Sequence, residues 1–304
     1  MGIKLGIHTG PQDLSMQDLQ RIWRRADEAR LHWASVWDHF YANPLRERTD
    51  PCFEGVASMA ALAASTQRLR VGCLVFCALF RNPGLLAKAA VTIDHLSDGR
   101  CELGVGAGWF EEEFSDFGYA FPPLGERLDQ LEEALAILRA LLREGEVSFK
   151  GRFYEMEGAV CSPRPRNPGL RIWVGGRGPK RTPRIAARHA DGFNVPYPSP
   201  EEYAVRLGAL DEACAAIGRD PAEIERSVNV AFLVSVDAKA GASSERAPGP
   251  LPPGVLVGGV AQAIDRIGEY ERAGAQGLNI AFRPPVDWEA YQAFLEEAVP
   301  VFHG

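Results

Sequence analysis

The chain has 304 residues, of which 46% are hydrophobic and 24% are charged, and its formal net charge is −7 at pH 7. These values are ordinary for a globular protein, and the acidic balance argues against a general nucleic-acid binder, which needs an excess of Lys and Arg. No apolar run approaches the roughly 20 residues of a membrane span, and the N-terminus shows no signal-peptide pattern, so we expect a cytoplasmic protein.

Strand-like apolar runs alternate with helix-like amphipathic runs along the whole chain. The predicted strands cover residues 3–8, 33–37, 69–76, 101–106, 171–175, 192–195, 227–236 and 277–282. The predicted helices begin at Ser15 and then cover 52–65, 83–96, 124–143, 179–189, 200–217, 260–273 and 288–299, with a small hairpin over 147–154. Eight such units predict a parallel sheet and favour a (β/α)8 TIM barrel with insertions, forming one domain over residues 1–304.

The segment 238–254 breaks this alternation. It is rich in Pro, Gly and Ser, and it follows the seventh predicted strand. We interpret it as a flexible active-site lid, and the alternative is an insertion without a role. The six cysteines are scattered without a CxxC pair, so we expect reduced, mostly buried thiols and no zinc site.

In a TIM barrel the loops that follow the strands carry the chemistry. The second predicted strand ends in Asp38 and His39, a carboxylate and an imidazole that can both handle a proton near pH 7. The alternative is a polar pair that only holds the loop. His8 stands alone at the end of the first strand, so the several converging ligands of a metal site are missing and no metal is predicted.

A glycine-rich stretch follows the fourth predicted strand. Gly106, Ala107, Gly108 and Trp109 resemble part of a dinucleotide fingerprint, but Trp109 occupies the place of its third glycine. The segment also comes fourth in the alternation and not first, which weakens a Rossmann interpretation. Glycines at this spacing let the backbone lie flat against a ligand ring, and the alternative is a tight turn alone.

The fifth predicted strand leads into Gly175, Gly176, Arg177, Gly178 and Pro179, and we expect the next helix to begin at the proline. A glycine-rich loop before a helix N-terminus is an anion site, because free N–H groups and the helix dipole both favour negative charge. The alternative is a solvated basic helix face.

Two further charged residues have an open interpretation. Arg127, near the start of the helix over 124–143, is a candidate for a second phosphate contact or for a surface pair with Glu126. Glu54, just inside the helix over 52–65, is a candidate ligand contact or a partner of the helix dipole.

Long collinear strings carry a resemblance to a known family. They are WDHF at the end of 19–40, the whole of 69–100, CELGVGAGWFEEEF at 101–114, FPPLGERLDQLEEAL at 121–135, IWVGGRGPKRTPRIAARHADGFN at 172–194 and GRDP at 218–221. The chain resembles the luciferase-like monooxygenase (LLM) superfamily of TIM barrels, and within it the branch of oxidoreductases that use coenzyme F420.

The resemblance implies a site for the deazaflavin ring. A non-proline cis peptide maps onto Leu74–Val75 in a bulge of the third strand, and Asp38 and His39 map beside the hydride-bearing C5 of the cofactor. His39 is then the expected proton donor or acceptor, with Asp38 orienting its loop. The loop from Gly106 to Trp109 would line the ring, and the loop from Gly175 to Pro179, with Arg127, would hold the phosphate side.

The implied substrate is a small organic molecule. His8, Glu54 and Phe80 are expected in its pocket, and Trp109 with Phe80 would make that pocket apolar. Some sugar-phosphate dehydrogenases of this branch have Glu where this chain has Trp109, which argues against the sugar-phosphate reaction.

Two other functions stay open. One is an FMN-dependent two-component monooxygenase, and the other is a barrel that binds flavin without catalysis. The resemblance also implies a reductase that supplies reduced F420 or flavin, and a homodimer.

Overall fold

The computed structural model describes residues 2–43, 47–234, 253–282 and 286–302. Eight parallel strands form a closed barrel, because β8 pairs with both β7 and β9 and so joins the two sides of the sheet. Around the barrel the order is β1 (Lys4–His8), β2 (Trp33–Val36), β3 (Arg70–Cys77), β4 (Cys101–Gly106), β7 (Arg171–Gly175), β8 (Gly192–Pro196), β9 (Glu225–Val234) and β11 (Gly277–Ala281). The predicted (β/α)8 barrel is therefore confirmed.

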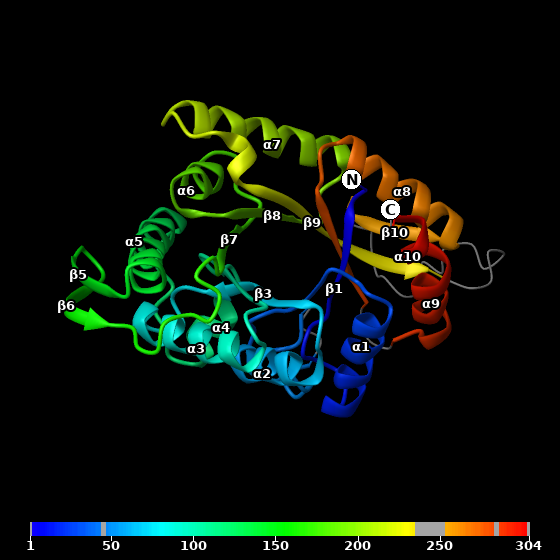
Figure 1. The fold of residues 1–304 in the computed structure, drawn as a ribbon, viewed down its shortest axis with the longest axis horizontal. Coiled ribbons are helices and arrows are strands. Elements are labelled where there is room, and N and C mark those ends of the chain that lie inside the picture. Colours follow the sequence, from blue (N-terminus) through cyan, green and yellow to red (C-terminus); the bar gives the residue numbers. More distant parts are fainter. Residues whose placement is uncertain (1, 44–46, 235–252, 283–285, 303–304) are drawn as a thin grey trace.

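Helices surround the barrel (Figure 1). They are α1 (Met16–Glu28), α2 (Gly55–Ser65), α3 (Pro83–Leu96), α4 (Glu111–Asp116), α5 (Leu124–Arg143), α6 (Arg181–His189), α7 (Pro200–Ala215), α8 (Val260–Arg272), α9 (Trp288–Ala293) and α10 (Val299–Phe302). An antiparallel hairpin of β5 (Glu146–Lys150) and β6 (Glu155–Val160) lies beside α5. No helix in the described ranges combines the length and the apolar character needed to cross a membrane.

The observed elements differ from the predicted ones in a few places. Helix α6 begins at Arg181 and not at Pro179, because Lys180 still has non-helical dihedrals of φ −125° and ψ −57°. The short helix α4 and the strand β10 (Val255–Gly258), which pairs outside the barrel with β9, were not predicted. Most of the predicted lid at 238–254 lies outside the described residues, so its role stays a prediction, as does the single domain over 1–304.

Capping and apolar spacing explain how α1 is placed. The side chain of Ser15 accepts a hydrogen bond from the backbone N–H of Asp18 at 3.1 Å, which begins the helix. The buried face consists of Leu19, Ile22, Trp23 and Ala26, at helical spacing. This face packs on the barrel, so the loop between β1 and α1 is held at the C-terminal end of the strands. All six cysteines are free thiols and five of them are buried, as expected for thiols of this spacing.

A bulge interrupts β3 next to β4. The peptide bond Leu74–Val75 is cis, as the family resemblance implied, and the register with β4 shifts between Cys73 and Phe76. A Cβ atom at Gly104 would lie only 2.2 Å from the carbonyl oxygen of Cys73. Glycine at this position of β4 therefore allows the bulged backbone of β3 to approach.

Replacing this glycine tests how tightly β4 packs on the bulge. We expect Gly104→Ala to lower the free energy of unfolding by about 1–3 kcal/mol, because the new methyl group meets backbone that cannot move aside freely. The matched control is Gly208→Ala in the exposed face of α7, where a Cβ would meet nothing within 4 Å and stability should rise by up to about 1 kcal/mol. Urea denaturation measures both, and equal stability of the two variants would contradict the packing argument.

Charged side chains close the opposite, N-terminal end of the barrel. Glu102 is buried, accepts a hydrogen bond from Trp173 Nε1 at 2.7 Å and pairs with Arg70. Lys4 pairs with Glu225 at 2.7 Å between nitrogen and oxygen. Burial raises the pKa of Glu102, although the neighbouring Arg70 opposes this shift.

His32 lies in the same charged region. Burial first, and then the positive charges of Lys4, Arg70 and Arg171, lower its pKa from 6.5 to about 4. Because the unfolded chain takes up a proton near pH 6.5 and the folded chain only near pH 4, the contribution of this group to stability falls as pH decreases through that window.

Urea denaturation at pH 7 and pH 5 tests this linkage. Between these two values we expect the wild type to lose roughly 1–2 kcal/mol more of its free energy of unfolding than His32→Gln does. The same loss in both proteins would assign the pH dependence to other groups.

Candidate active site

A cavity of about 580 Å³ opens at the C-terminal ends of the barrel strands. Its lining includes most of the residues predicted for the site: His8, Asp38, His39, Leu74, Val75, Phe80, Gly106, Ala107, Gly108, Trp109, Gly175, Gly176, Arg177 and Gly178. It also includes residues that were not predicted, among them Glu113, Thr182, Asn194 and Asn229. The strand-end loops therefore meet at one place, as barrel geometry requires.

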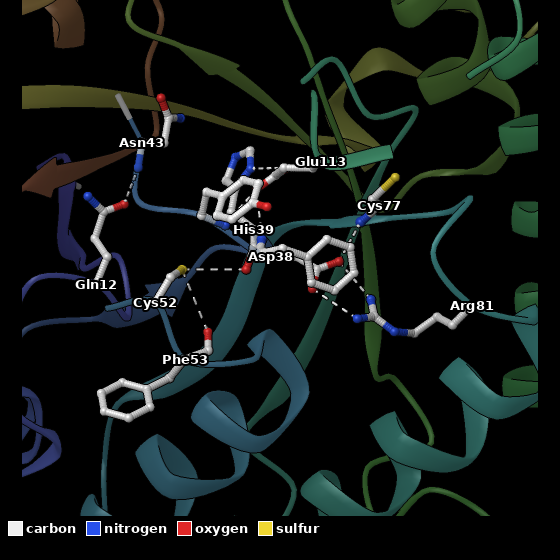
Figure 2. A network of polar contacts seen from close by, with 11 residues as sticks. Gln12, Asp38, His39, Asn43, Cys52, Phe53, Cys77, Arg81 and Glu113 are labelled. Atoms are coloured by element: carbon white, nitrogen blue, oxygen red, sulfur yellow. Dashed lines mark hydrogen bonds and ion pairs between the residues drawn. The ribbon is translucent and has the colours of Figure 1, made fainter. Parts of the chain in front are cut away.

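His39 is held by a buried carboxylate, as Figure 2 shows. Its Nδ1 lies 2.8 Å from Glu113 Oε2, and the Glu113 side chain is only 1% exposed. The other oxygen, Oε1, accepts the backbone N–H groups of Phe40 at 2.7 Å and Tyr41 at 3.0 Å. One carboxylate from α4 thus fixes both the ring of His39 and the backbone that follows it.

This contact decides which ring nitrogen is available for chemistry. With Glu113 ionised, Nδ1 of His39 carries the hydrogen and donates it, so the lone pair or the second proton resides on Nε2. The ring meets Trp109 edge-on, with centroids 5.7 Å apart, and Phe110 in the same way at 6.1 Å. These aromatic neighbours keep the imidazole from turning.

Asp38 supports the same loop from the other side (Figure 2). Its carboxylate forms a two-pronged ion pair with Arg81, at 2.7 and 2.9 Å, and accepts the backbone N–H of Cys77 at 2.9 Å. Burial alone would lower the pKa of Arg81, but its hydrogen bonds and ion pair with Asp38 raise it. With its oxygens engaged in this way, Asp38 links the loop to Arg81 and to the end of β3, and its orienting role in the reaction stays a prediction.

Backbone forms the cavity wall at β3, β4 and β7. The side chain of Val75, at the cis peptide, projects between two glycines: a Cβ at Gly106 would lie 2.5 Å from it and one at Gly175 would lie 2.6 Å from it. Gly108 has a positive φ of 71°, which favours glycine. Because no side chain can grow from these positions without a clash, the wall is able to receive a flat ring.

The N-terminus of α6 borders the same wall. Its N-cap residue, Lys180, makes no side-chain cap, so the first backbone N–H groups of the helix are available to an anion. Thr182 lines the cavity beside Gly178, where a Cβ would lie 2.5 Å from the threonine Oγ1. Arg177 lines the cavity as well. These groups lie where the sequence predicts an anion site, which stays a prediction, and the helix starts two residues later than predicted.

Three predicted site residues do not line the cavity. Arg127 lies over the ring of Phe121, 3.9 Å from its centroid, and donates to the carbonyl of Pro122 at 2.6 Å. Glu54 caps α2 by accepting the N–H of Ala57 at 2.7 Å. Pro179 also lies outside the lining. Glu54 also pairs with Arg81, at 3.1 Å between Oε1 and Nη2, so its observed contacts are with the start of α2 and with this arginine.

Three further predicted residues, His8, Phe80 and Trp109, contribute aromatic side chains to the cavity lining. His8 is buried, its Nδ1 lies 2.9 Å from Ser35 Oγ and its ring is 5.1 Å from that of Trp37. Phe80 packs against Phe40 with centroids 4.6 Å apart. Trp109 is 60% exposed at the mouth. The described residues contain no cluster of three or more His, Cys, Asp or Glu side chains that could hold a metal ion.

Comparisons with known proteins agree with this architecture. The model of the luciferase-like monooxygenase family matches residues 1–248. The chain belongs to the luciferase-like monooxygenase family. It is 32% identical over 254 residues to an F420-dependent glucose-6-phosphate dehydrogenase of Nocardia farcinica, covering 82% of this chain and 74% of the relative. The enzyme of the same description from Amycolatopsis mediterranei is 30% identical over 252 residues, with the same coverage.

Among solved structures, a similar fold is that of an F420-dependent secondary alcohol dehydrogenase in complex with an F420-acetone adduct. Its TM-score is 0.84 at 19% sequence identity, and the match covers 100% of both chains. At this identity the likeness concerns the fold of the luciferase-like family.

Glu113 is the main residue of the site that sequence reasoning missed. It is the last of three consecutive glutamates at 111–113, a pattern typical of a solvated helix start, where acidic side chains complement the dipole. Only the apolar Phe114 beside it indicated that one of the three turns inward.

The ring tautomer of His39 tests the role of Glu113. Glu113→Gln keeps Oε1 for the two backbone N–H groups but presents an NH2 group to Nδ1, so we expect the ring hydrogen to move to Nε2. Histidine ¹⁵N chemical shifts measure this change. The matched control is Glu112→Gln, an exposed neighbour, which should leave the shifts as in the wild type; an unchanged tautomer in Glu113→Gln would contradict the assignment.

Proposed function

We propose that this protein is an oxidoreductase that transfers hydride between coenzyme F420 and a small organic substrate. The observation that carries the proposal is the meeting, in one cavity, of a backbone wall at the β3 bulge with a histidine held by a buried glutamate. Family relatives described as F420-dependent dehydrogenases support the choice of cofactor.

The residues present fit such a cofactor. Gly106 and Gly175 add no side chain to this wall beyond that of Val75, which lies between them, and such a wall suits a planar ring. The N-terminus of α6 and Arg177 are suited to its phosphate. When bound and reduced, F420 supplies the hydride from its C5.

The chain contributes positioning and proton handling. His39 donates a proton from Nε2 to a substrate that is being reduced, and in the reverse direction it accepts one there. Glu113 keeps Nδ1 occupied so that only Nε2 serves the substrate. Asp38 and Arg81 hold the loop and act through His39, as positioning residues.

The lining favours a substrate without strong negative charge. Among the described residues that line the cavity, Arg177 is the only one with a permanent positive charge, and it borders the anion site assigned to the cofactor. Trp109 and Phe110 stack with centroids 5.2 Å apart at the mouth. We therefore propose that the substrate is an uncharged, largely apolar molecule and differs from the sugar phosphate of the relatives.

Parallel fluorescence titrations of the purified protein with oxidised F420 and with FMN test the cofactor. We expect micromolar or tighter binding of F420 and weaker binding of FMN. Arg177→Ala should weaken F420 binding roughly tenfold, because a charged hydrogen bond to a phosphate contributes about 1.5–3 kcal/mol. Arg184→Ala removes a charge of the same kind from the exposed part of α6, outside the cavity lining, and should bind as the wild type does.

Two outcomes would reverse the proposal. Preference for FMN would favour the two-component monooxygenase, whose signature is oxygen consumption. Binding of neither cofactor would remove the proposed role of the cavity. A reductase that supplies the reduced cofactor, a homodimer and a cytoplasmic location stay predictions from the sequence.

A further inference from the structure

A chain of buried polar side chains crosses three neighbouring strands below the cavity. Asn194 on β8 donates from Nδ2 to Ser227 Oγ at 2.8 Å and to Asn229 Oδ1 at 3.0 Å, both on β9. Asn279 on β11 donates to the same Asn229 Oδ1 at 3.1 Å. All four side chains belong to residues no more than 2% exposed. Such a layer is unusual where hydrophobic side chains normally fill a barrel.

The hydrogen bonds within this layer can be counted. Both hydrogens of Asn194 Nδ2 are used, and both lone pairs of Asn229 Oδ1 are used. The remaining groups are Asn194 Oδ1, an acceptor, and Asn229 Nδ2, a donor, for which the described residues provide no partner. These two residues line the cavity, whereas Ser227 and Asn279 do not.

A donor and an acceptor that face the cavity without a protein partner are suited to a ligand. Both residues line the cavity, so a ligand there can pair with the two groups in place of water. Turning one amide alone would set oxygen against oxygen or NH2 against NH2, so the three asparagines keep or reverse their orientation together. In the observed arrangement the pair forms an edge that offers one acceptor, on Asn194, and one donor, on Asn229, to the cavity.

The strand order places this edge opposite the rest of the site. Around the closed barrel, β8 lies across the axis from β2, and β9 lies across from β3. The loop after β2 carries His39, and β3 carries the bulge at Leu74–Val75. A ligand in the cavity therefore meets the histidine on one side and the two amides on the other.

We propose that Asn194 and Asn229 form a binding subsite for a ligand group that presents an N–H beside a C=O, such as an imide, a lactam or a carboxamide. The N–H donates to Asn194 Oδ1 and the carbonyl accepts from Asn229 Nδ2. Two sources have this chemistry: the pyrimidine edge of a deazaflavin and the polar end of a substrate. The proposal deepens the proposed function and rests on it for the first source.

The edge also discriminates against other groups. A carboxylate would place one oxygen against Asn194 Oδ1, and an amidinium would place one N–H against Asn229 Nδ2. Each mismatch leaves a buried group unpaired, and sites that depend on buried hydrogen bonds reject such analogues strongly.

One substitution changes the free donor of this pair into an acceptor and leaves the side-chain shape almost unchanged. Asn229→Asp retains the oxygen that accepts from Asn194 and Asn279 and replaces only the free NH2 by a second acceptor. The matched control is Ser227→Ala, which removes one hydrogen bond of the same layer but no cavity group. Asn194→Ala, which removes the free acceptor, is the second variant should Asn229→Asp fail to fold by circular dichroism.

Two titrations are made on each variant. The first follows oxidised F420 by fluorescence. The second follows benzamide, benzoate and benzamidine by ligand-observed NMR, on protein saturated with F420 and on protein without it. Wild type and Ser227→Ala should agree within about twofold in both titrations.

Either of two results supports the subsite. F420 binding weakened tenfold or more by Asn229→Asp assigns the edge to the cofactor. Unchanged F420 binding, with benzamide weakened tenfold and benzamidine strengthened, assigns it to the substrate. Unchanged binding of both F420 and benzamide overturns the proposal. If the wild type binds no F420, the proposed function fails, and the benzamide series on unloaded protein still decides the subsite.

Discussion

Two buried carboxylates hold the loop after β2, and the candidate site depends on them. Glu113 takes three N–H groups from residues 39–41, and Asp38 pairs with Arg81 and with the backbone of Cys77. The loop is therefore bound to α4, to the end of β3 and to the loop that follows β3. Holding the loop of His39 from several elements at once lowers the entropy lost when a ligand binds, because the geometry exists beforehand.

The cavity wall at β3, β4 and β7 depends on a different constraint, the presence of glycine at positions where a side chain would clash. The bulge of β3 pushes Val75 inward, and glycines on β4 and β7 make room for it. The glycines and the Val75 side chain set the shape of this wall, and the buried asparagines lie on the opposite side of the barrel. A barrel can divide these tasks because its eight strands point their ends at the same space.

The local pattern of the sequence was sufficient for the barrel, and the family resemblance for the cis peptide at Leu74–Val75. The local pattern was insufficient where the position of a side chain depends on a partner far away in the sequence. His39 and Glu113 are 74 positions apart, so no periodicity links them. Arg127 has the charge expected of a phosphate ligand, yet Phe121 and Pro122 bind it. The start of α6 was placed early because Pro179 suits a first helical turn, whereas the glycine loop continues to Lys180.

The two ends of the described chain lie next to each other, with Gly2 close to the backbone oxygen of Phe302, and Figure 1 shows both ends on one side of the barrel. Since β1 starts there, this side is remote from the cavity mouth, which lies at the opposite ends of the strands. Because the barrel is closed and its chain ends are adjacent, any of its strands could come first in the chain without changing the pairing of the strands. Circular permutation, with new ends opened in the exposed β5–β6 hairpin, would therefore change the order of folding and leave the arrangement of the cavity as it is.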